Sequence, residues 1–590
     1  MIQKELFKKL GDICSVVLLA TLATSCGPTL STAELDMSDR ASESSQLDLD
    51  YEHFELDNGL KVILHQDLSD PIVAIATVVH VGSSREKPGR TGFAHFFEHM
   101  AFNDSENVPK GANRKMIPEL GGSRNGGTWT DGTIYYEVVP KDAFDKLLWI
   151  DSDRFGYMIN TVKQATLERE KQVVKNERRE RYDNSPYGLT REVIVKSLYP
   201  EGHPYNWTTI GDLKDLQAAT LEDVKEFYAK YYVPANATLV IAGDIDMAET
   251  RQKVQNWFGE IKAGPVAPAL KPQPVSLSES KRLYHLDNFA QLPELRLTFP
   301  TIHQYHHDAY ALSALAEMFA SGKDSALYKE VVAAGKLAPG VSAYNYSSEI
   351  AGSFTVRVRA NANQNLDAVY QSIDKAIASF ETEGFSDQKL QKYKAEQETS
   401  FYYGIESILD KALQMGQYNE FAGSPDFLMQ DIDNITSVKR ADIERVFKKY
   451  IKNQPAIITS FVPKAQPDLV LSGSQQAVIE EEKIVANAEP DFVEEEGSDF
   501  AITPTNFDRS EPPLSALPKL TMPAVWRRET GNGIEVLGIE QNELPLVNFR
   551  LRVAGGQLLD PAGKTGTGAL MAALMNEGTA TKTPQALAEA

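Results

Sequence analysis

The chain has 590 residues, of which 42% are apolar and 24% charged, and a formal net charge of −22. This length predicts several domains, about four at typical domain sizes, and the composition is that of a soluble globular protein. The negative charge excludes nucleic acid as a partner, because no basic stripe is present to neutralise phosphates. It is compatible with basic peptides as ligands, since an acidic cavity attracts them.

The N-terminus has the pattern of an export signal. Three lysines within the first nine residues precede an apolar run, Ile13 to Ala23, that is too short to span a bilayer as a mature helix. The run leads into Leu22-Ala-Thr-Ser-Cys26-Gly27, which resembles the lipobox where bacterial lipoproteins are cut before an acylated cysteine. We therefore predict a lipoprotein-type signal peptide over 1–26. An ordinary signal peptide cut nearby is the alternative.

The cysteine content agrees with lipidation. The chain contains two cysteines, Cys14 inside the predicted signal and Cys26 at the predicted cut. The mature chain would keep only Cys26, which would carry a lipid anchor, so no intramolecular disulfide is expected. Gly27 gives no inner-membrane retention cue, so the resemblance implies an exported outer-membrane lipoprotein facing the periplasm. Residues 27–50 are rich in Ser, Thr and Asp and are expected to form a flexible tether.

A first domain is predicted over 51–268, and it contains the motif His95-Phe-Phe-Glu-His99. On a helix, positions four apart share a face, so His95 and His99 can direct two imidazole nitrogens at one metal ion. Glu98 lies beside them, where a carboxylate can take a proton from an activated water. The order matches the inverted zincin signature His-x-x-Glu-His. Without its surroundings, the motif could be a coincidence on an amphipathic helix.

A catalytic zinc needs a third protein ligand, and the charged segment 167–181 offers candidates. Its pattern predicts a long helix on which Glu170 and Glu177, seven residues apart, share a face. Taken alone, these residues favour a solvated helix with exposed Glu/Arg pairs.

Together these segments resemble the pitrilysin (insulinase-like, M16) metallopeptidases, and the likeness runs from about residue 50 to the end of the chain. The apolar setting of the motif over 92–102 and the strand-like segment 125–137 are similar to those of the family. The resemblance implies one Zn²⁺ in the catalytic domain with Glu177 as its third ligand. Glu170 would lie outside the ligand set and hold a histidine ring.

The resemblance also implies that the segment beginning at Asn125 is an edge strand that pairs with the substrate backbone, with Thr128 and Thr130 beside the bound peptide.

Residues 280–465 are predicted to form a second, non-catalytic domain, because they contain no inverted motif. We interpret the three histidines within 303–307 as surface residues and not as metal ligands. An acidic, proline-rich linker is predicted over 466–520.

Residues 521–590 are predicted to begin a degenerate repeat of the first domain. Arg528-Glu-Thr-Gly-Asn-Gly-Ile-Glu-Val-Leu537 is similar to Phe54-Glu-Leu-Asp-Asn-Gly-Leu-Lys-Val-Ile63. The same register pairs Gly563-Lys-Thr-Gly566 with Gly89-Arg-Thr-Gly92 and places alanines opposite all three motif residues. These alanines are Ala569, Ala572 and Ala573. The repeat is expected to keep the helix without a metal site, and the chain is expected to end inside this third domain.

These observations predict an α+β protein of tandem repeated two-layer domains, each an antiparallel sheet packed with helices, of the M16 clamshell type. The expected activity is that of a zinc metalloendopeptidase cleaving oligopeptides or unfolded polypeptides. His95, His99 and Glu177 would hold the metal and Glu98 would act as general base. A C-terminal half or a partner subunit would close the chamber. The alternatives are a non-catalytic chamber-forming or peptide-binding subunit and a different zinc hydrolase.

Overall fold

The computed structural model of the protein describes residues 49–479 and 500–589. The predicted signal peptide, Cys26 and nearly all of the predicted tether lie outside these ranges. The larger of two compact units comprises Leu49–Ser321 and Ser325–Gln541, and the smaller contains the C-terminal segment that starts at Asn542. Within the described ranges, each helix is too short or too polar to cross a bilayer.

The first sheet has six strands in the order β1-β2-β6-β3-β5-β4. Their bounds are β1 (Glu52–Glu55), β2 (Lys61–Gln66), β3 (Ile72–Val79), β4 (Ser123–Thr128), β5 (Thr133–Pro140) and β6 (Ala237–Gly243). β2 and β6 are parallel, whereas the other neighbours are antiparallel. Because the chain returns to β2 only after a long helical crossover, a parallel pair is possible there.

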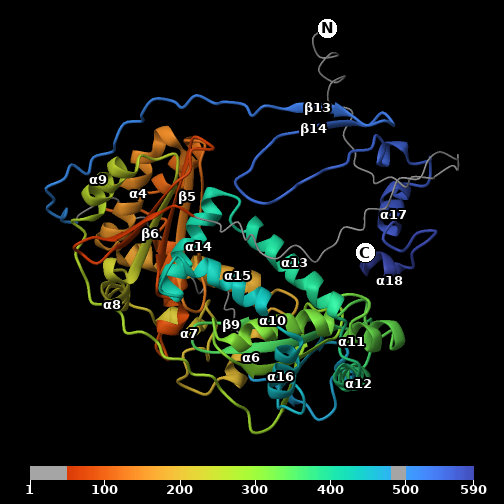
Figure 1. Ribbon diagram of the computed structural model, residues 1–590. Helices are drawn as coiled ribbons and strands as arrows, with labels where there is room; N and C mark the ends of the chain where they lie inside the picture. Colours follow the sequence, from red (N-terminus) through yellow and green to blue (C-terminus); the bar gives the residue numbers. More distant parts are fainter. Residues whose placement is uncertain (1–48, 480–499, 590) are drawn as a thin grey trace. The chain divides into compact units, whose positions relative to one another are not determined.

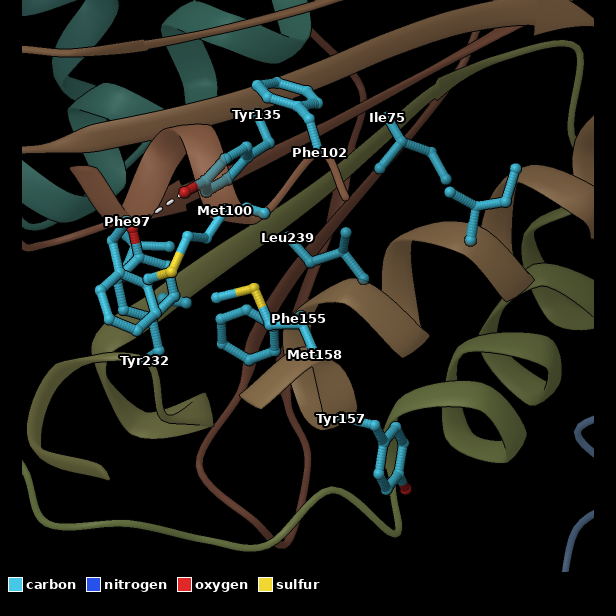
Figure 2. Close-up of a cluster of buried hydrophobic side chains, with 14 of the residues drawn as sticks. Ile75, Phe97, Met100, Phe102, Tyr135, Phe155, Tyr157, Met158, Tyr232 and Leu239 are labelled. Carbon is cyan, nitrogen blue, oxygen red and sulfur yellow. Dashed lines mark hydrogen bonds between the residues drawn. The ribbon is translucent and has the colours of Figure 1, made fainter. Parts of the chain in front are cut away.

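One face of this sheet packs against the helices of the first domain. These are α2 (Phe93–Met100), α3 (Ala112–Glu119), α4 (Phe144–Tyr157), α5 (Gln164–Arg178), α7 (Leu213–Ala218), α8 (Leu221–Tyr231) and α9 (Met247–Phe258). α6 (Thr190–Leu198) also belongs to the first domain but packs against β11 (Ile457–Pro463) of the second sheet. Figure 2 shows part of the core, where Phe97 and Met100 of α2 lie near Tyr135 and Tyr232. The hydroxyls of the two tyrosines are 2.8 Å apart. The core therefore fixes the helix that carries the motif.

The second sheet has the order β12-β7-β11-β8-β10-β9. Its strands are β7 (Lys281–Asp287), β8 (Glu294–Thr301), β9 (Ser342–Ser347), β10 (Gly352–Arg359), β11 (Ile457–Pro463) and β12 (Gln475–Gln476). The helices of this region are α10 (His307–Ala320), α11 (Ala326–Tyr328), α12 (Leu366–Glu383), α13 (Asp387–Tyr403), α14 (Ile408–Phe421), α15 (Phe427–Ser437) and α16 (Arg440–Tyr450). β7 is parallel to both β11 and β12.

Five strands of each sheet follow one topology. β2-β6-β3-β5-β4 in the first sheet corresponds to β7-β11-β8-β10-β9 in the second, and each series begins with a parallel pair. The predicted α+β class is therefore confirmed, and the two repeated sheets are both covered by helices. The predicted antiparallel pairing applies to most neighbouring strands, but each sheet is mixed. The strand that ends each domain inserts between strands formed earlier in the chain and is parallel to one of them.

The second face of the first sheet is covered by α14, which lies more than 160 residues after β6 in the sequence. In Figure 1 this helix lies along β6. Ile408, Ala412 and Met415 pack against small and β-branched residues of the sheet. A Cβ atom on Gly416 would lie 2.8 Å from Val78 Cγ2, so the helix depends on glycine at this close approach. β3 and β6 are consequently buried on both faces, which explains their nearly continuous apolar sequences.

The described part of the predicted linker makes specific contacts with the first domain. Arg509 is only 4% exposed. Its guanidinium donates to Ser152 Oγ at 2.8 Å and to the carbonyl oxygen of Trp257 at 2.9 Å. The segment around Arg509 is therefore anchored on the domain, with the polar groups of the buried arginine paired.

The C-terminal region contains a two-stranded sheet and two helices. Their bounds are β13 (Trp526–Glu529), β14 (Glu535–Gly538), α17 (Thr567–Leu574) and α18 (Pro584–Glu589). α17 spans the three alanines that align with the motif residues. The extent of this repeat as a domain stays a prediction.

Candidate metal centre

His95, His99 and Glu177 come together from α2 and α5. Their ligand atoms all lie within 4.8 Å of one another. Glu177 Oε2 is 3.1 Å from His99 Nε2, and Glu177 Oε1 is 3.7 Å from His95 Nε2. Two helices distant in sequence therefore present two imidazoles and one carboxylate to the same point.

The two faces of α2 have different environments. Phe96 and Phe97, between the motif histidines, are almost fully buried, which fixes the rotation of the helix. The helix begins after Gly92, whose φ of 87° is in the left-handed region. A Cβ atom there would lie 2.7 Å from the carbonyl oxygen of Ile210, so a larger residue would displace the start of the helix.

The buried carboxylate of Glu86 caps the first turn of α2. It accepts hydrogen bonds from the backbone N–H groups of Gly92, at 2.9 Å, and Ala94, at 2.8 Å. These bonds satisfy two of the N–H groups that a helix start leaves without partners. Sequence reasoning missed Glu86, because it precedes the helix by more than one turn.

On α5, Glu170 and Glu177 are both directed into the domain from one side of the helix, as predicted. Arg181 Nη1, one turn further on, is 2.8 Å from Glu177 Oε1, an i,i+4 pair of the kind that the charged pattern of this segment favours. The charged pattern, taken alone, favours a solvated helix with exposed Glu/Arg pairs, but Arg178 is only 2% exposed. Its charge is paired with Glu192 at 2.8 Å and it also donates to the Gly211 carbonyl, which makes burial possible.

The electrostatics of the cluster favour metal-binding protonation states. Burial, and then the neighbouring His99, lower the pKa of His95 to about 4, so its ring is neutral at pH 7. The hydrogen bond from His99 is the main factor that lowers the pKa of Glu177 and keeps it ionised. Two imidazole nitrogens and a carboxylate are a ligand combination that suits Zn²⁺.

Glu98 has the opposite shift. Burial raises the pKa of its carboxyl group, and the hydrogen bond from the Thr128 hydroxyl to Glu98 Oε2, at 2.7 Å, opposes this effect. Glu98 and Glu177 therefore have different proton affinities within one site, which is typical of groups with different chemical tasks.

The three residues predicted beside the substrate have different positions. β4 is an edge strand whose described hydrogen-bonding neighbour is β5. Asn125 is exposed on this strand and Thr128 ends it next to Glu98. Thr130 lies beyond the strand end and is buried, and its carbonyl oxygen accepts a hydrogen bond from Ser84 N at 2.7 Å.

The role predicted for Glu170 is not visible as a hydrogen bond. Glu170 Oε1 accepts from Asn103 Nδ2 at 3.2 Å and from Arg169 Nε at 3.1 Å. Glu170 Oε2 and His95 Nδ1 are both buried without a partner among the residues described. The interaction of Glu170 with a histidine ring stays a prediction.

A second group of potential ligands is formed by His306, His307 and Asp308. The Asp308 carboxylate is already paired with Arg445 and with Lys449, the latter at 2.8 Å. His306 Nδ1 accepts a hydrogen bond from Asp308 N at the start of α10. Two cations on the carboxylate compete with a metal ion for its oxygens. The interpretation of these histidines as surface residues that bind no metal stays a prediction.

Two family models match the chain, and each covers one of the two groups of potential metal ligands. Residues 61–203 match the model described as Insulinase (Peptidase family M16), and residues 218–397 match the model described as Peptidase M16 inactive domain. The chain belongs to the M16 (insulinase) family of peptidases. The candidate metal cluster lies in the region that matches the insulinase model.

Related proteins include several named as zinc proteases. The chain is 29% identical to zinc protease PqqE of Helicobacter pylori over 412 residues, which cover 68% of this chain and 90% of that protein. It is 25% identical to the Bacillus subtilis zinc protease YmxG over 395 residues, covering 66% and 92%.

Solved structures show the same fold. A protease from Helicobacter pylori superposes with a TM-score of 0.64 at 26% identity, covering 70% of this chain and 99% of that chain. The first half of the periplasmic protease PqqL from Escherichia coli gives a TM-score of 0.60 at 19% identity, covering 72% and 95%.

Proposed function

We propose that this protein is a zinc metalloendopeptidase that cleaves oligopeptides or unfolded polypeptides. The observation that carries the proposal is the convergence of His95, His99 and Glu177, with Glu98 beside them, in the region that matches the insulinase model. A domain that only built a chamber would not need to retain these four residues. The zinc proteases among the relatives support the same activity.

In this proposal, His95, His99 and Glu177 would hold one Zn²⁺, which would supply Lewis-acid chemistry by lowering the pKa of a water molecule and polarising the scissile carbonyl. Glu98 accepts a proton from the attacking water and transfers it to the leaving amine. The hydroxyl of Thr128 holds Glu98 Oε2 and leaves Oε1 to take the proton. Its raised pKa suits a carboxyl group that must keep the proton until the amine leaves.

The substrate would bind as an additional strand on β4, next to Asn125 and Thr128. Glu170 would hold the His95 ring through the two unpaired buried atoms. We also propose export to the cell envelope with a lipid anchor on Cys26, and closure of the chamber by a C-terminal half or a partner subunit. Of these proposals, export is consistent with the description of PqqL as a periplasmic protease.

The proposal is tested with the purified protein and a set of unstructured peptides of about twenty to thirty residues. The expected result is cleavage that a chelator abolishes and added zinc restores. Glu98→Gln should still bind zinc, but its cleavage rate should fall by about 10²- to 10⁴-fold, the usual contribution of a general base. Glu180→Gln is the matched control, because Glu180 is exposed near the end of α5 and should leave cleavage unchanged.

Two results would contradict the proposal. Full activity of Glu98→Gln would exclude this residue as the base. Stoichiometric zinc with no cleavage by the wild-type protein, alone or with a closing partner, would support the alternative of a non-catalytic peptide-binding subunit.

A further inference from the structure

A polar pocket lies between α6 and the face of the second sheet that the helices of that domain leave open. Its cavity volume is about 170 Å³. Thr130 and Arg191 line it from the first domain, and Arg296, Tyr344 and Tyr346 line it from the second. The proposed mechanism uses none of the residues from the second domain.

Strand register explains why this face is polar. Arg296 on β8 pairs with Arg357 on β10, and Thr298 pairs with Thr355, which in turn pairs with Tyr344 on β9. Directly paired residues project from one face of a sheet. The alternate residues of β8 and β10 are buried in the apolar core of the domain, among the helices on the opposite face.

The pocket face is strongly basic. Arg296, Arg357 and Arg359 all bind one buried carboxylate, that of Glu294, at distances of 2.6 to 2.9 Å. Burial opposes ionisation of Glu294, but the arginines outweigh it and lower its pKa. One negative charge therefore faces three positive ones.

Arg191 adds a fourth positive charge. Its guanidinium lies over the ring of Tyr346, 5.5 Å from the centroid, and forms no ion pair with any residue in the described ranges. The Asp131 carboxylate behind the pocket is occupied by the Tyr205 hydroxyl, at 2.7 Å, and by Glu349 N, at 3.0 Å. The local charge is thus opposite to the net charge of −22 of the whole chain.

The pocket adjoins the candidate active site along the chain. Thr130, in the pocket wall, follows Thr128, whose hydroxyl contacts Glu98. Because two residues of chain span at most about 7 Å, Thr130 lies within that distance of Thr128. A peptide added to β4 would therefore bring a side chain near the scissile bond within reach of the arginines.

We propose that this pocket is a subsite for a carboxylate of the peptide substrate, either an acidic side chain or the C-terminal carboxylate. Guanidinium groups bind carboxylates through paired, charge-assisted hydrogen bonds, and the tyrosine hydroxyls add further donors. The inference rests on the proposed peptidase function. It reverses the preference for basic peptides that net charge alone suggested.

The test is a set of peptides of one unstructured sequence with amidated ends, in which glutamate or glutamine is placed in turn at each position around the cleaved bond. Glutamate at one position should raise kcat/KM about tenfold or more over glutamine. Arg191→Gln should reduce this ratio severalfold, and Arg191→Gln with Arg296→Gln should bring it close to one. Arg282→Gln is the matched control, because Arg282 lies on β7 of the same sheet but over the ring of Tyr370 in α12, and should keep the wild-type ratio.

The source of the carboxylate and the failure of each proposal are separable. If a free C-terminus, and not internal glutamate, raises kcat/KM, the subsite binds the terminal carboxylate. The subsite would be overturned if kcat/KM were equal for glutamate and glutamine at every position and also equal for free and amidated termini. This result would leave the peptidase function intact.

Binding measured by fluorescence anisotropy on the Glu98→Gln variant removes the dependence on turnover. The preferred carboxylate peptide should bind severalfold more tightly than its neutral counterpart, and equal Kd values would overturn the subsite. Absence of chelator-sensitive cleavage of every peptide would overturn the peptidase function itself.

Discussion

At the scale of single residues, Glu98 and Glu177 lie beside the same two histidines but their pKa values shift in opposite directions. Burial dominates at Glu98 and raises its pKa, whereas the hydrogen bond from His99 dominates at Glu177 and lowers it. In the proposed mechanism, the same side chain would serve as a proton carrier at one position and as an anionic ligand at the other. The neighbours decide between the two roles.

Thr128→Val tests the contact that orients Glu98. The loss of the 2.7 Å hydrogen bond should lower kcat by about ten- to a hundredfold, because a hydrogen bond to a charged group contributes about 1.5–3 kcal/mol. Zinc content, measured by metal analysis, should not change, since Thr128 is not a ligand. Thr128→Ser keeps a hydroxyl and should restore most of the activity. A loss of bound zinc in Thr128→Val would contradict an effect through Glu98 alone.

At the scale of secondary-structure elements, the start of the motif helix has a counterpart in the C-terminal region. Asp560 accepts hydrogen bonds from Gly566 N, at 2.6 Å, and Gly568 N, at 2.8 Å, at the start of α17. Glu86 makes the same two bonds at α2, 474 residues earlier in the predicted register. The geometry of the helix start is therefore shared, although the candidate metal-binding histidines are present at only one of the two helices.

Glu86→Ala should weaken the metal site without removing a ligand. The lost cap should reduce stability by about 1–2 kcal/mol and lower zinc affinity severalfold, because α2 positions both histidines. Zinc titration and thermal unfolding measure the two effects. Asp560→Ala removes the equivalent cap from α17 and should leave zinc affinity unchanged. Equal zinc affinity in Glu86→Ala and the wild type would show that the cap does not position the ligands.

At the scale of the whole molecule, the two sheet domains of the larger unit are joined by buried polar contacts. His80, next to β3, donates to Glu349 Oε2 at 3.0 Å, and its other ring nitrogen is 3.5 Å from Glu420 Oε2 on α14. Burial opposes protonation of His80, but these two carboxylates outweigh it and raise the pKa to about 9. The imidazolium is therefore part of the contact between the domains at neutral pH.

This contact predicts a loss of stability at alkaline pH. An unfolded histidine has a pKa of about 6.5, so the contribution is fully present below that pH and is lost as the pH rises through about 9. The contribution of the His80 contact to the free energy of unfolding is at most roughly 3 kcal/mol. Thermal unfolding of the wild type should therefore show a larger decrease in Tm between pH 6.5 and 9 than that of His80→Gln. Equal decreases in both proteins would exclude His80 as the titrating group.

The sequence by itself determined the features that depend on local spacing. His95 shares one helical face with Glu98 and His99 because they lie three and four residues further on. The helix at 567–574 follows from the repeat of the turn before it. The α+β class followed from the alternation of strand and helix patterns. Glu177 could not be selected from its helix pattern, which fits a solvated surface equally well, and was identified through the resemblance to the M16 family.

Only the tertiary structure decided which surfaces meet. The apolar side of α14 has the same periodicity whichever sheet it covers, so its position on the first sheet could not be predicted. The burial of Arg178 and the position of Arg191 in the pocket wall, without an ion pair among the described residues, both depend on residues distant in the sequence. Side-chain periodicity gives the direction of a face, whereas the identity of its partner depends on long-range packing. Side-chain periodicity therefore accounts for the shared face of the motif residues in the candidate metal site. Long-range packing accounts for the charge of the pocket beside that site.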